Sequence, residues 1–308
     1  MRAVILANRQ SGTNRQDAEA LERACAAFGE GCELITLDPD TDLSDLIDHK
    51  ISEGAEAVIS AGGDGTAMAI ANAMLGRDVP MGVLPMGTFN YFTRGLGLSE
   101  VPEEAAAQLR DGETHDIRIG QVNGRAFLNN ASLGVYPAIL KKREAIYDRW
   151  GRHRVVAYWS VIKTILQTQH RMKLSITADG TTHEVKTPLV FIARSAYQLD
   201  VFGLDGAETI SEDGFATFVI HARSRMDLMR LAITLAARKM PPRQDFTLIR
   251  AHEVVIEHQG KAQPPFLTAF DGEKARLSAP LTLSMSEAPL RILTPKSTPQ
   301  KTEDQIAA

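Results

Sequence analysis

The stretch Val58-Ile59-Ser60-Ala61-Gly62-Gly63-Asp64-Gly65-Thr66 decides the fold of this chain. The apolar run before it predicts a buried parallel strand, and the good helix formers over 66–75 predict a helix after it. Glycines leave backbone N–H groups uncovered by Cβ atoms, and a helix N-terminus behind them attracts an anion. The carboxylate of Asp64 would repel that anion unless Mg²⁺ lies between them. The stretch therefore predicts a phosphate-binding turn, or else a tight connection with Asp64 or Thr66 as the helix cap.

A second segment repeats this pattern one strand and one helix later. Val83-Leu84-Pro85-Met86-Gly87-Thr88-Phe89-Asn90 again predicts a strand followed by a polar turn. The carboxyl ends of neighbouring parallel strands lie at one edge of a sheet, so we expect the two turns to meet at one crevice. Two such turns together favour a binding site over a plain connection.

The two segments together resemble a known family. Gly62–Thr66 followed by Pro85–Arg94 is similar to the catalytic domain of the diacylglycerol kinases, a family that includes soluble bacterial lipid kinases and the sphingosine and ceramide kinases. The first motif alone is shared with NAD kinases and the 6-phosphofructokinase superfamily, whereas the pair at this spacing is more specific. The resemblance covers the chain from Asn8 to Pro295. It implies ATP and Mg²⁺ as cofactors and a lipid hydroxyl as the phosphoryl acceptor.

The first loop of the chain also resembles the family, with departures. Asn8 to Gly12 is similar to the family's opening nucleotide loop, although a turn that starts a helix explains these residues equally well. Arg9 replaces a common proline, Thr13 stands where lysine or glycine is usual, and Tyr91 stands where an acid or histidine is common. The ATP-binding residues that the resemblance implies are Asn8, Ser11, Gly12, Gly62, Gly63, Asp64, Gly65, Thr66, Gly87, Thr88 and Asn90, with Asp64 acting through the metal.

The segment Phe270-Asp271-Gly272-Glu273 resembles the family's Asp-Gly-Glu signature. Phosphoryl transfer to an alcohol needs a carboxylate within hydrogen-bond reach of the acceptor hydroxyl. A plain Asp-Gly hairpin turn is the alternative, and by itself the simpler one. With the kinase motifs in the same chain we expect Asp271 to be the base and Glu273 to assist it, with Asp64 as the third catalytic residue.

Further residues are assigned by the same resemblance. Asp213-Gly214 is similar to a segment that holds a structural Mg²⁺ in some members, although a simple turn explains it equally well. Asp116 matches an Asp-x-Gly motif at the crossover between domains, where it either faces the cleft or caps a strand. Asn129 opens a segment that resembles a second wall of the cleft. The residues expected to contact the substrate are therefore Arg94, Asp116 and Asn129.

The change in hydrophobic period predicts two domains. Strands alternating with helices predict an α/β domain with a parallel sheet over 1–116, of the kind found in NAD kinases. Short alternating runs over 117–286 predict an antiparallel β-sandwich, and the resemblance implies that this part binds the lipid. The resemblance returns a last strand, at about 287–295, to the first domain and implies an active site in the cleft between the two. Residues 296–308 are expected to form a frayed tail.

Composition narrows the class of protein. The chain has 308 residues, of which 44% are hydrophobic and 23% charged, and its net charge is −4. That charge argues against a nucleic-acid partner. No apolar run approaches the roughly 18 residues needed to span a bilayer, so we expect a cytoplasmic protein that visits the inner face of the membrane. Cys25 and Cys32 are expected to be buried reduced thiols without a disulfide.

A basic run with aromatic residues bears on the membrane expectation. Lys141–Arg143 and Arg149–Arg154 surround Trp150, with Tyr158 and Trp159 close behind. Such a run is either a solvated face or a contact for anionic lipid headgroups. We expect peripheral contact with a membrane that holds the lipid substrate. The oligomeric state is left open, with a homodimer as one alternative.

The motifs together predict a lipid kinase that transfers the γ-phosphoryl group of ATP, with diacylglycerol as the default acceptor and phosphatidic acid as its product. A sphingoid base or ceramide kinase is the first alternative. An NAD kinase is the second, although the Asn-Glu motif of that family is absent from the sequence. The third is a catalytically idle homologue that binds nucleotide or lipid, an alternative that Thr13 and Tyr91 keep open.

Overall fold

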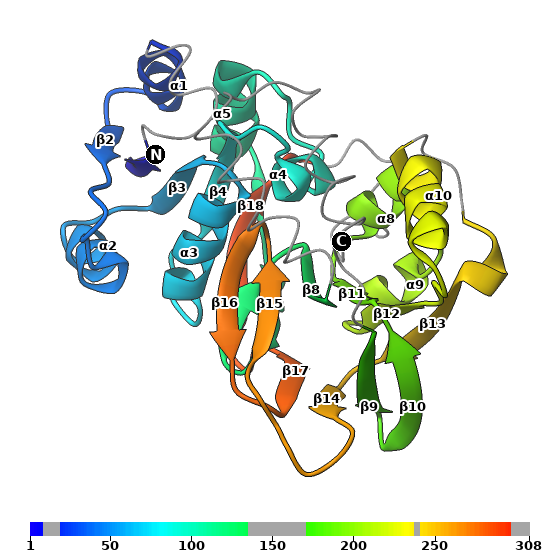
Figure 1. Cartoon of the computed structure of the whole chain (residues 1–308). Coiled ribbons are helices and arrows are strands. Elements are labelled where there is room, and N and C mark those ends of the chain that lie inside the picture. The colour runs from blue at the N-terminus through cyan, green and yellow to red at the C-terminus, as the bar shows by residue number, and fades with distance from the viewer. Residues whose placement is uncertain (9–18, 135–170, 237–240, 297–308) are drawn as a thin grey trace. The chain divides into compact units, whose positions relative to one another are not determined.

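The structure is a computed structural model, and it describes residues 1–8, 19–134, 171–236 and 241–296 (Figure 1). The chain divides into two compact units. The first comprises Met1–Gly120 and the residues from Ser286 onward, and the second comprises Gln121–Met285. The boundary expected at residue 116 falls inside a strand of the first unit. The basic run at 141–154 and the tail at 297–308 lie outside the described residues.

The first unit is built on a six-stranded sheet in the order β2-β1-β3-β4-β18-β5. The neighbours from β2 to β18 pair in parallel, and β5 pairs antiparallel with β18. β1, β3 and β4 are buried along their whole length, as parallel strands are when helices cover both faces. The strands are β1 (Ala3–Ala7), β2 (Glu33–Thr36), β3 (Ala57–Gly62), β4 (Met81–Pro85), β5 (Glu113–Ile117) and β18 (Leu290–Thr294).

Five helices accompany this sheet, and α1 packs against α5 while α2 packs against α3. They are α1 (Ala20–Phe28), α2 (Leu43–Ser52), α3 (Asp64–Met74), α4 (Tyr91–Gly95) and α5 (Pro102–Arg110). α3 begins at Asp64, two residues before the predicted start, because Gly63 already serves as its N-cap. The short helix α4 had no sequence prediction. Its single turn is too short to show a hydrophobic period.

The prediction of two reduced cysteines is wrong. The structure joins Cys25 of α1 to Cys32 by a disulfide, with their Cα atoms 5.6 Å apart. α1 ends before Gly29, which has a φ of 100°, and the N–H of Cys32 donates to the carbonyl of Gly29 at 3.1 Å. This turn reverses the chain and brings the second cysteine back beside the helix. The pairing follows from the turn, which the spacing of the cysteines alone did not reveal.

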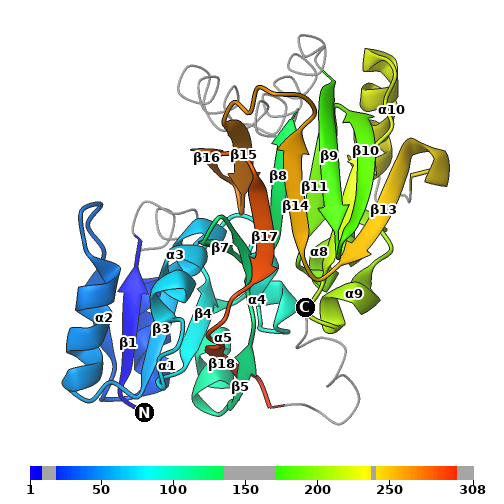
Figure 2. The same cartoon turned by 90° about the horizontal axis from the view of Figure 1, so that it is seen from below.

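The second unit contains two six-stranded sheets, in the orders β10-β9-β14-β17-β6-β7 and β13-β12-β11-β8-β15-β16 (Figure 2). All neighbours in the latter pair antiparallel, as do β10, β9, β14 and β17 in the former. This confirms the predicted fold class, an α/β part followed by an antiparallel β-rich part. The strands are β6 (Gly120–Val122), β7 (Arg125–Phe127), β8 (Asn130–Gly134), β9 (Met172–Ala178), β10 (Thr181–Thr187), β11 (Leu189–Ala193), β12 (Phe215–Ile220), β13 (Phe246–Ala251), β14 (Val254–His258), β15 (Phe266–Phe270), β16 (Glu273–Leu277) and β17 (Leu281–Met285).

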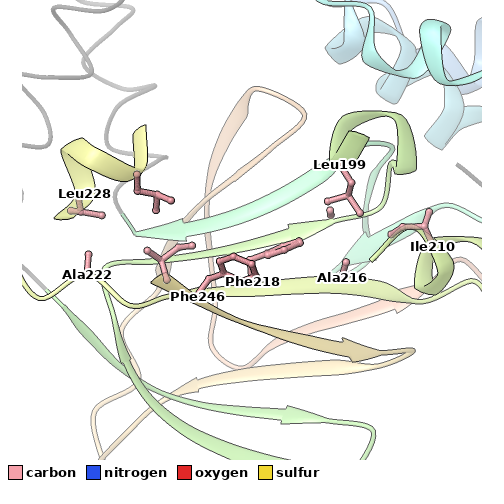
Figure 3. Packing of buried hydrophobic residues seen from close by; sticks show 10 residues of the cluster. Leu199, Ile210, Ala216, Phe218, Ala222, Leu228 and Phe246 are labelled. Atoms are coloured by element: carbon pink, nitrogen blue, oxygen red, sulfur yellow. The ribbon is translucent and has the colours of Figure 1, made fainter. Parts of the chain in front are cut away.

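Three helices cover one face of the sheet formed by β11, β12 and β13. They are α8 (Ala196–Phe202), α9 (Ala207–Ser211) and α10 (Arg225–Ala236), and a 3₁₀ turn, η2 (Arg243–Asp245), precedes β13. Leu199, Ile210 and Leu228 from these helices pack with Phe218 of β12 in one buried cluster (Figure 3). Three positions earlier in β12, on the opposite face of the strand, Phe215 contacts Phe127 of the other sheet, with ring centroids 6.0 Å apart. β12 is therefore buried on both faces.

The N-terminus of α2 provides a test of local stabilisation. The carboxylate of Asp42 accepts hydrogen bonds from the N–H groups of Ser44 (2.9 Å) and Asp45 (3.1 Å), so Asp42 caps the helix. We expect Asp42→Ala to lower the free energy of unfolding by about 1 kcal/mol, the usual cost of losing such a cap. Chemical denaturation measures this. Asp40→Ala is the matched control, and a loss of the same size in that variant would contradict the capping assignment.

Candidate functional site

The two turns singled out in the sequence lie side by side in the first unit. Gly62, at the end of β3, pairs in register with Pro85, at the end of β4. The turn after β3 and the turn after β4 lie so close together that a Cβ atom on Gly87 would be 2.5 Å from the Cα of Gly63. No side chain fits at position 87 without a backbone shift. The predicted convergence of two glycine turns at one sheet edge is therefore present.

Asn90 fixes the shape of the second turn. Its side-chain oxygen accepts from the N–H of Gly87 at 2.8 Å, and its side-chain nitrogen donates to the carbonyl of Gly87 at 3.1 Å. Asn90 itself has a φ of 52°, in the left-handed region that asparagine tolerates better than most residues. The buried side-chain amide of Asn90 therefore holds the second turn in shape through two hydrogen bonds to the backbone of Gly87.

The N-terminus of α3 opens at the same edge. Its N-cap is Gly63, which has no side chain to accept from the first-turn N–H groups. These groups have no partner within a helix, so they are suited to an anion. Asp64 stands in this first turn, and its Oδ1 accepts from the N–H of Phe92 in α4 at 3.2 Å. The carboxylate therefore also ties α4 to the turn, a role that the sequence did not indicate.

The end of β1 joins this arrangement. The N–H of Asn8 donates to the carbonyl of Ala61 at 3.0 Å, and its side-chain nitrogen donates to the hydroxyl of Thr66 at 3.3 Å. Thr88 is exposed on the second turn. Ser11 and Gly12 lie outside the described residues. The structure thus brings together, within one unit, every nucleotide residue expected from the sequence that it describes.

These residues suit a phosphate group and one bound Mg²⁺. The helix N-terminus offers N–H donors, and Asp64 offers the hard oxygen ligand that Mg²⁺ prefers. Within the described ranges there is no group of three or more His, Cys, Asp or Glu side chains that could hold a metal ion. Asp64 would therefore hold Mg²⁺ together with phosphate oxygens and water, which is how this ion is commonly bound.

In the second unit, Asp271 is held by backbone donors. It occupies the two-residue turn between β15 and β16, with a φ of 47°, and only 8% of it is exposed. Its Oδ1 accepts from the N–H groups of Asn129 (2.8 Å) and Asn130 (3.1 Å), and its Oδ2 accepts from Leu128. Both oxygens are therefore engaged. The carboxylate fixes the turn to the start of β8 and has little capacity left for a substrate hydroxyl.

Glu273, the second acid of the same signature, is placed differently. It opens β16 on the far side of the turn, and its side chain remains in contact with solvent. Partial burial by surrounding atoms raises the pKa of its carboxyl above the usual value, and the positive charge of Arg125 opposes the effect in part. A carboxylate with a raised pKa is a stronger base than an ordinary glutamate. Arg125 was not singled out in the sequence, because it lies in a strand of the other sheet and far from Glu273 along the chain.

Asp213 compensates a buried cation. Its Oδ1 lies 2.7 Å from Nη2 of Arg194, a residue that is only 5% exposed, and Nη1 of this arginine donates to the carbonyl of Ile210 at 3.0 Å. A buried guanidinium requires such partners. The carboxylate expected to contribute to a structural Mg²⁺ site is thus engaged in an ion pair, and the metal assignment stays a prediction.

Each of the residues expected to contact substrate has a partner within its own unit. Asp116 pairs with Arg291 across β5 and β18, at 3.1 Å from Nε, and this pairing raises the pKa of the arginine. Arg94 of α4 pairs with Glu100 at 2.9 Å. Asn129 contributes its backbone N–H to Asp271, as described above. These contacts identify structural partners for all three and leave their substrate role a prediction.

The geometry of the first unit defines a class: an α/β domain with a mainly parallel sheet, in which two glycine turns and a helix N-terminus meet at one edge. Residues 2–122 match the family model "Diacylglycerol kinase catalytic domain". A protein of Pseudomonas fluorescens (strain Pf0-1) named "Probable lipid kinase YegS-like" is 37% identical over 95 residues, which are 30% of this chain and 31% of that protein. A protein of the same name from Pseudomonas aeruginosa (strain PAO1) is 31% identical over 133 residues, 42% of this chain and 43% of its own length. The N-terminal part of the chain, residues 2–122, therefore resembles the diacylglycerol kinase catalytic domain.

The sequence similarity covers only part of this chain and of these relatives, whereas a similarity of fold extends over nearly the whole chain. The matched stretches span less than half of each named relative. A solved diacylglycerol kinase structure from Bacillus anthracis str. Sterne covers 95% of this chain and 96% of its own, with a TM-score of 0.67 and 18% identity. At that identity the likeness establishes the shared fold. None of the helices in the described ranges has the length and apolar character required to cross a membrane.

The close approach of the two turns leads to a prediction with an internal control. We expect Gly87→Ala to lower the free energy of unfolding by about 1–3 kcal/mol, because its Cβ would overlap Gly63 and Asn90. In Gly63→Ala the new Cβ meets nothing closer than 3.6 Å, so we expect a cost below about 1 kcal/mol. Denaturation of both variants measures the difference. Equal losses would contradict the close approach.

Proposed function

We propose that this chain transfers the γ-phosphoryl group of ATP to the hydroxyl group of a lipid, with diacylglycerol as the first acceptor to test. The observation that carries the proposal is the pair of turns at Gly63 and Gly87, whose backbones meet beside the N-terminus of α3. The match of residues 2–122 to the diacylglycerol kinase catalytic-domain model supports phosphoryl transfer. Two relatives carry the name "Probable lipid kinase YegS-like", and this name supports a lipid as the acceptor.

The first unit would bind the nucleotide. The N–H groups at the start of α3 and the exposed backbone of the glycine turns would contact the phosphates. Asn90 and Asn8 would hold those turns in shape through the hydrogen bonds described above. Bound Mg²⁺ would neutralise charge on the β- and γ-phosphates, and Asp64 is the residue that would hold it. Asn8, Thr66 and Thr88 complete the polar groups available to the nucleotide.

The second unit would supply the base. We assign that role to Glu273 in preference to Asp271, because three backbone N–H groups already bind Asp271. The hydroxyl oxygen of the acceptor forms a bond to the γ-phosphorus while the bond from that phosphorus to the β–γ bridging oxygen breaks. ADP leaves, and the hydroxyl proton passes to Glu273. Asp271 positions the turn on which Glu273 stands.

The decisive experiment incubates the purified protein with γ-labelled ATP and a panel of acceptors dispersed in non-ionic detergent. The panel comprises diacylglycerol, ceramide, sphingosine and NAD. Label on diacylglycerol would identify phosphatidic acid as the product. Label on ceramide, sphingosine or NAD would replace the acceptor in the proposal. ATP binding without transfer to any of the four would instead support an idle homologue.

A prediction concerns the two roles of Asp64. Asp64→Asn keeps an oxygen for the N–H of Phe92 and loses the charge that would hold Mg²⁺, so we expect an unchanged melting temperature and loss of transfer. Asp64→Ala loses the hydrogen bond as well, so we expect a fall in stability of about 1 kcal/mol in addition. Melting temperature and initial rate are measured on one preparation of each variant. Normal turnover in Asp64→Asn at ordinary Mg²⁺ would contradict the assignment.

A second prediction separates the two acids of the signature. Glu273→Gln should lower turnover by about 10²-fold or more, the usual contribution of a general base. Asp271→Ala should lower the free energy of unfolding by about 3 kcal/mol, since each buried N–H that loses its acceptor costs about 1–3 kcal/mol. Its turnover per folded molecule should change less than that of Glu273→Gln. The reverse order of turnover would return the role of base to Asp271.

The raised pKa of Glu273 sets the direction of its pH effects. Because the folded-state pKa lies above the unfolded one, folding favours the protonated carboxyl, and the free energy of unfolding falls as pH rises from the unfolded to the folded pKa. Glu273→Gln should therefore leave stability at neutral pH unchanged or slightly raised. The acid limb of the wild-type rate profile should lie above the usual glutamate pKa.

A further inference from the structure

We infer that the outer face of α10 is the surface by which this chain docks on an anionic lipid bilayer. α10 is apolar on two opposite faces. On the inner face, Leu228 and Leu231 are 7% and 6% exposed and pack with Ala222 and Phe246 in the core cluster of the second unit (Figure 3). The helix is thus already anchored to the sheet by one full apolar stripe.

The outer face carries two large apolar side chains that the core does not use. Met226 is 71% exposed and Ile233 is 63% exposed. They are seven residues, about two helical turns, apart and so lie on one side of the helix, opposite Leu228 and Leu231. The other large apolar residues exposed in the described ranges, Met1, Phe89 and Val101, are scattered over the first unit. An apolar stripe on the solvent side of an anchored helix indicates a contact with something outside the chain.

Positive charge surrounds this stripe in a chain that is acidic overall. Residues 221–236, the described part of this segment, contain three arginines, Arg223, Arg225 and Arg230, and a single acid, Asp227, whereas the whole chain has a net charge of −4. Arg223 is exposed just before α10, and the Nη2 of Arg171 donates to its carbonyl at 3.4 Å, which adds another cation. Cations at a helix N-terminus oppose the helix dipole, so they do not serve the stability of α10.

The acidic groups near the stripe are engaged. The carboxylate of Asp227 accepts from the N–H groups of Arg223 (3.0 Å) and Ser224 (2.8 Å), where it caps the start of α10. Asp245 pairs with Arg230, and one charge of each sign is thereby balanced. The uncompensated charge at the N-terminal end of the stripe therefore comes from arginines.

Exposed apolar side chains flanked by cations are the combination that binds anionic bilayers. The apolar groups insert into the boundary between headgroups and acyl chains, and the cations attract the anionic headgroups. This choice of occupant rests on the proposed function, because a lipid acceptor with long acyl chains resides in a bilayer. The inference adds the face of the protein that would meet that bilayer.

The test measures sedimentation of the full chain with vesicles, without nucleotide. One set is phosphatidylcholine, and in the other part of the phosphatidylcholine is replaced by phosphatidylglycerol. We expect the double variant Met226→Gln/Ile233→Gln to bind the anionic vesicles about tenfold more weakly than wild type. Val101→Gln, which removes an exposed apolar side chain in the first unit, is the matched control and should bind as wild type does.

A second variant tests the charge. We expect Arg171→Gln/Arg223→Gln to lose about fivefold in binding for each arginine removed. High salt should weaken wild-type binding towards that of this variant, since salt screens exposed charges. Wild-type binding that is equal on neutral and anionic vesicles would overturn the electrostatic part of the inference.

Other occupants of the face are distinguished by the same variants. Equal vesicle binding by wild type and Met226→Gln/Ile233→Gln overturns the inference. So does a lower melting temperature in that variant, which would show that another segment of this chain covers the face. Wild-type self-association that the variant loses, measured by analytical ultracentrifugation, would assign the face to a second copy.

The assay in detergent separates this inference from the proposed function. With the acceptor in non-ionic micelles, the Met226→Gln/Ile233→Gln variant should phosphorylate at the wild-type rate, and with anionic vesicles it should be slower. Failure of wild type to phosphorylate any lipid ends the proposed function, while the vesicle-binding results still decide the role of α10.

Discussion

The close approach of two backbones at Gly63 and Gly87 is the constraint on which the first unit depends. It follows from the register of β3 and β4, in which Gly62 lies beside Pro85. Strands that end level bring their following turns together, and a Cβ atom at position 87 would already collide with the neighbouring turn. The same closeness leaves backbone N–H groups without side chains over them. A packing restriction and the proposed binding surface thus have the same physical origin.

The polar side chains around this point serve the shape of the turns as much as any ligand. Asn90 closes the second turn, Asp64 ties α4 to the first, and Asn8 links β1 to Thr66. Such bonds hold the loop backbone in one conformation, and a site whose donors are already oriented binds with less loss of entropy. Removing any of these side chains therefore affects binding through geometry, even where the side chain touches no ligand.

The Asp271 turn illustrates how one buried carboxylate can organise a region. It collects three N–H groups from the start of β8 and so fixes where the hairpin of β15 and β16 begins. Glu273, two residues on, then stands at a defined place with a raised pKa. Asp271, which is buried and hydrogen-bonded, positions the turn. Glu273, which keeps contact with solvent, is the acid available for the proposed proton transfer. The two carboxylates of one short motif thus have different properties because their surroundings differ.

The sequence alone determined the elements and the turns. Apolar runs located β3 and β4, and the dipeptide Asp271-Gly272 located a hairpin turn, because each of these signals is local. Only the tertiary structure decided which groups those residues meet. The partners of Asp271 lie up to 143 positions away, and Arg291 reaches Asp116 from the far end of the chain. The cysteine pairing depended on a reversal at Gly29. Strand register and chain reversal are set by the packing of the whole unit, so periodicity and spacing could not supply them.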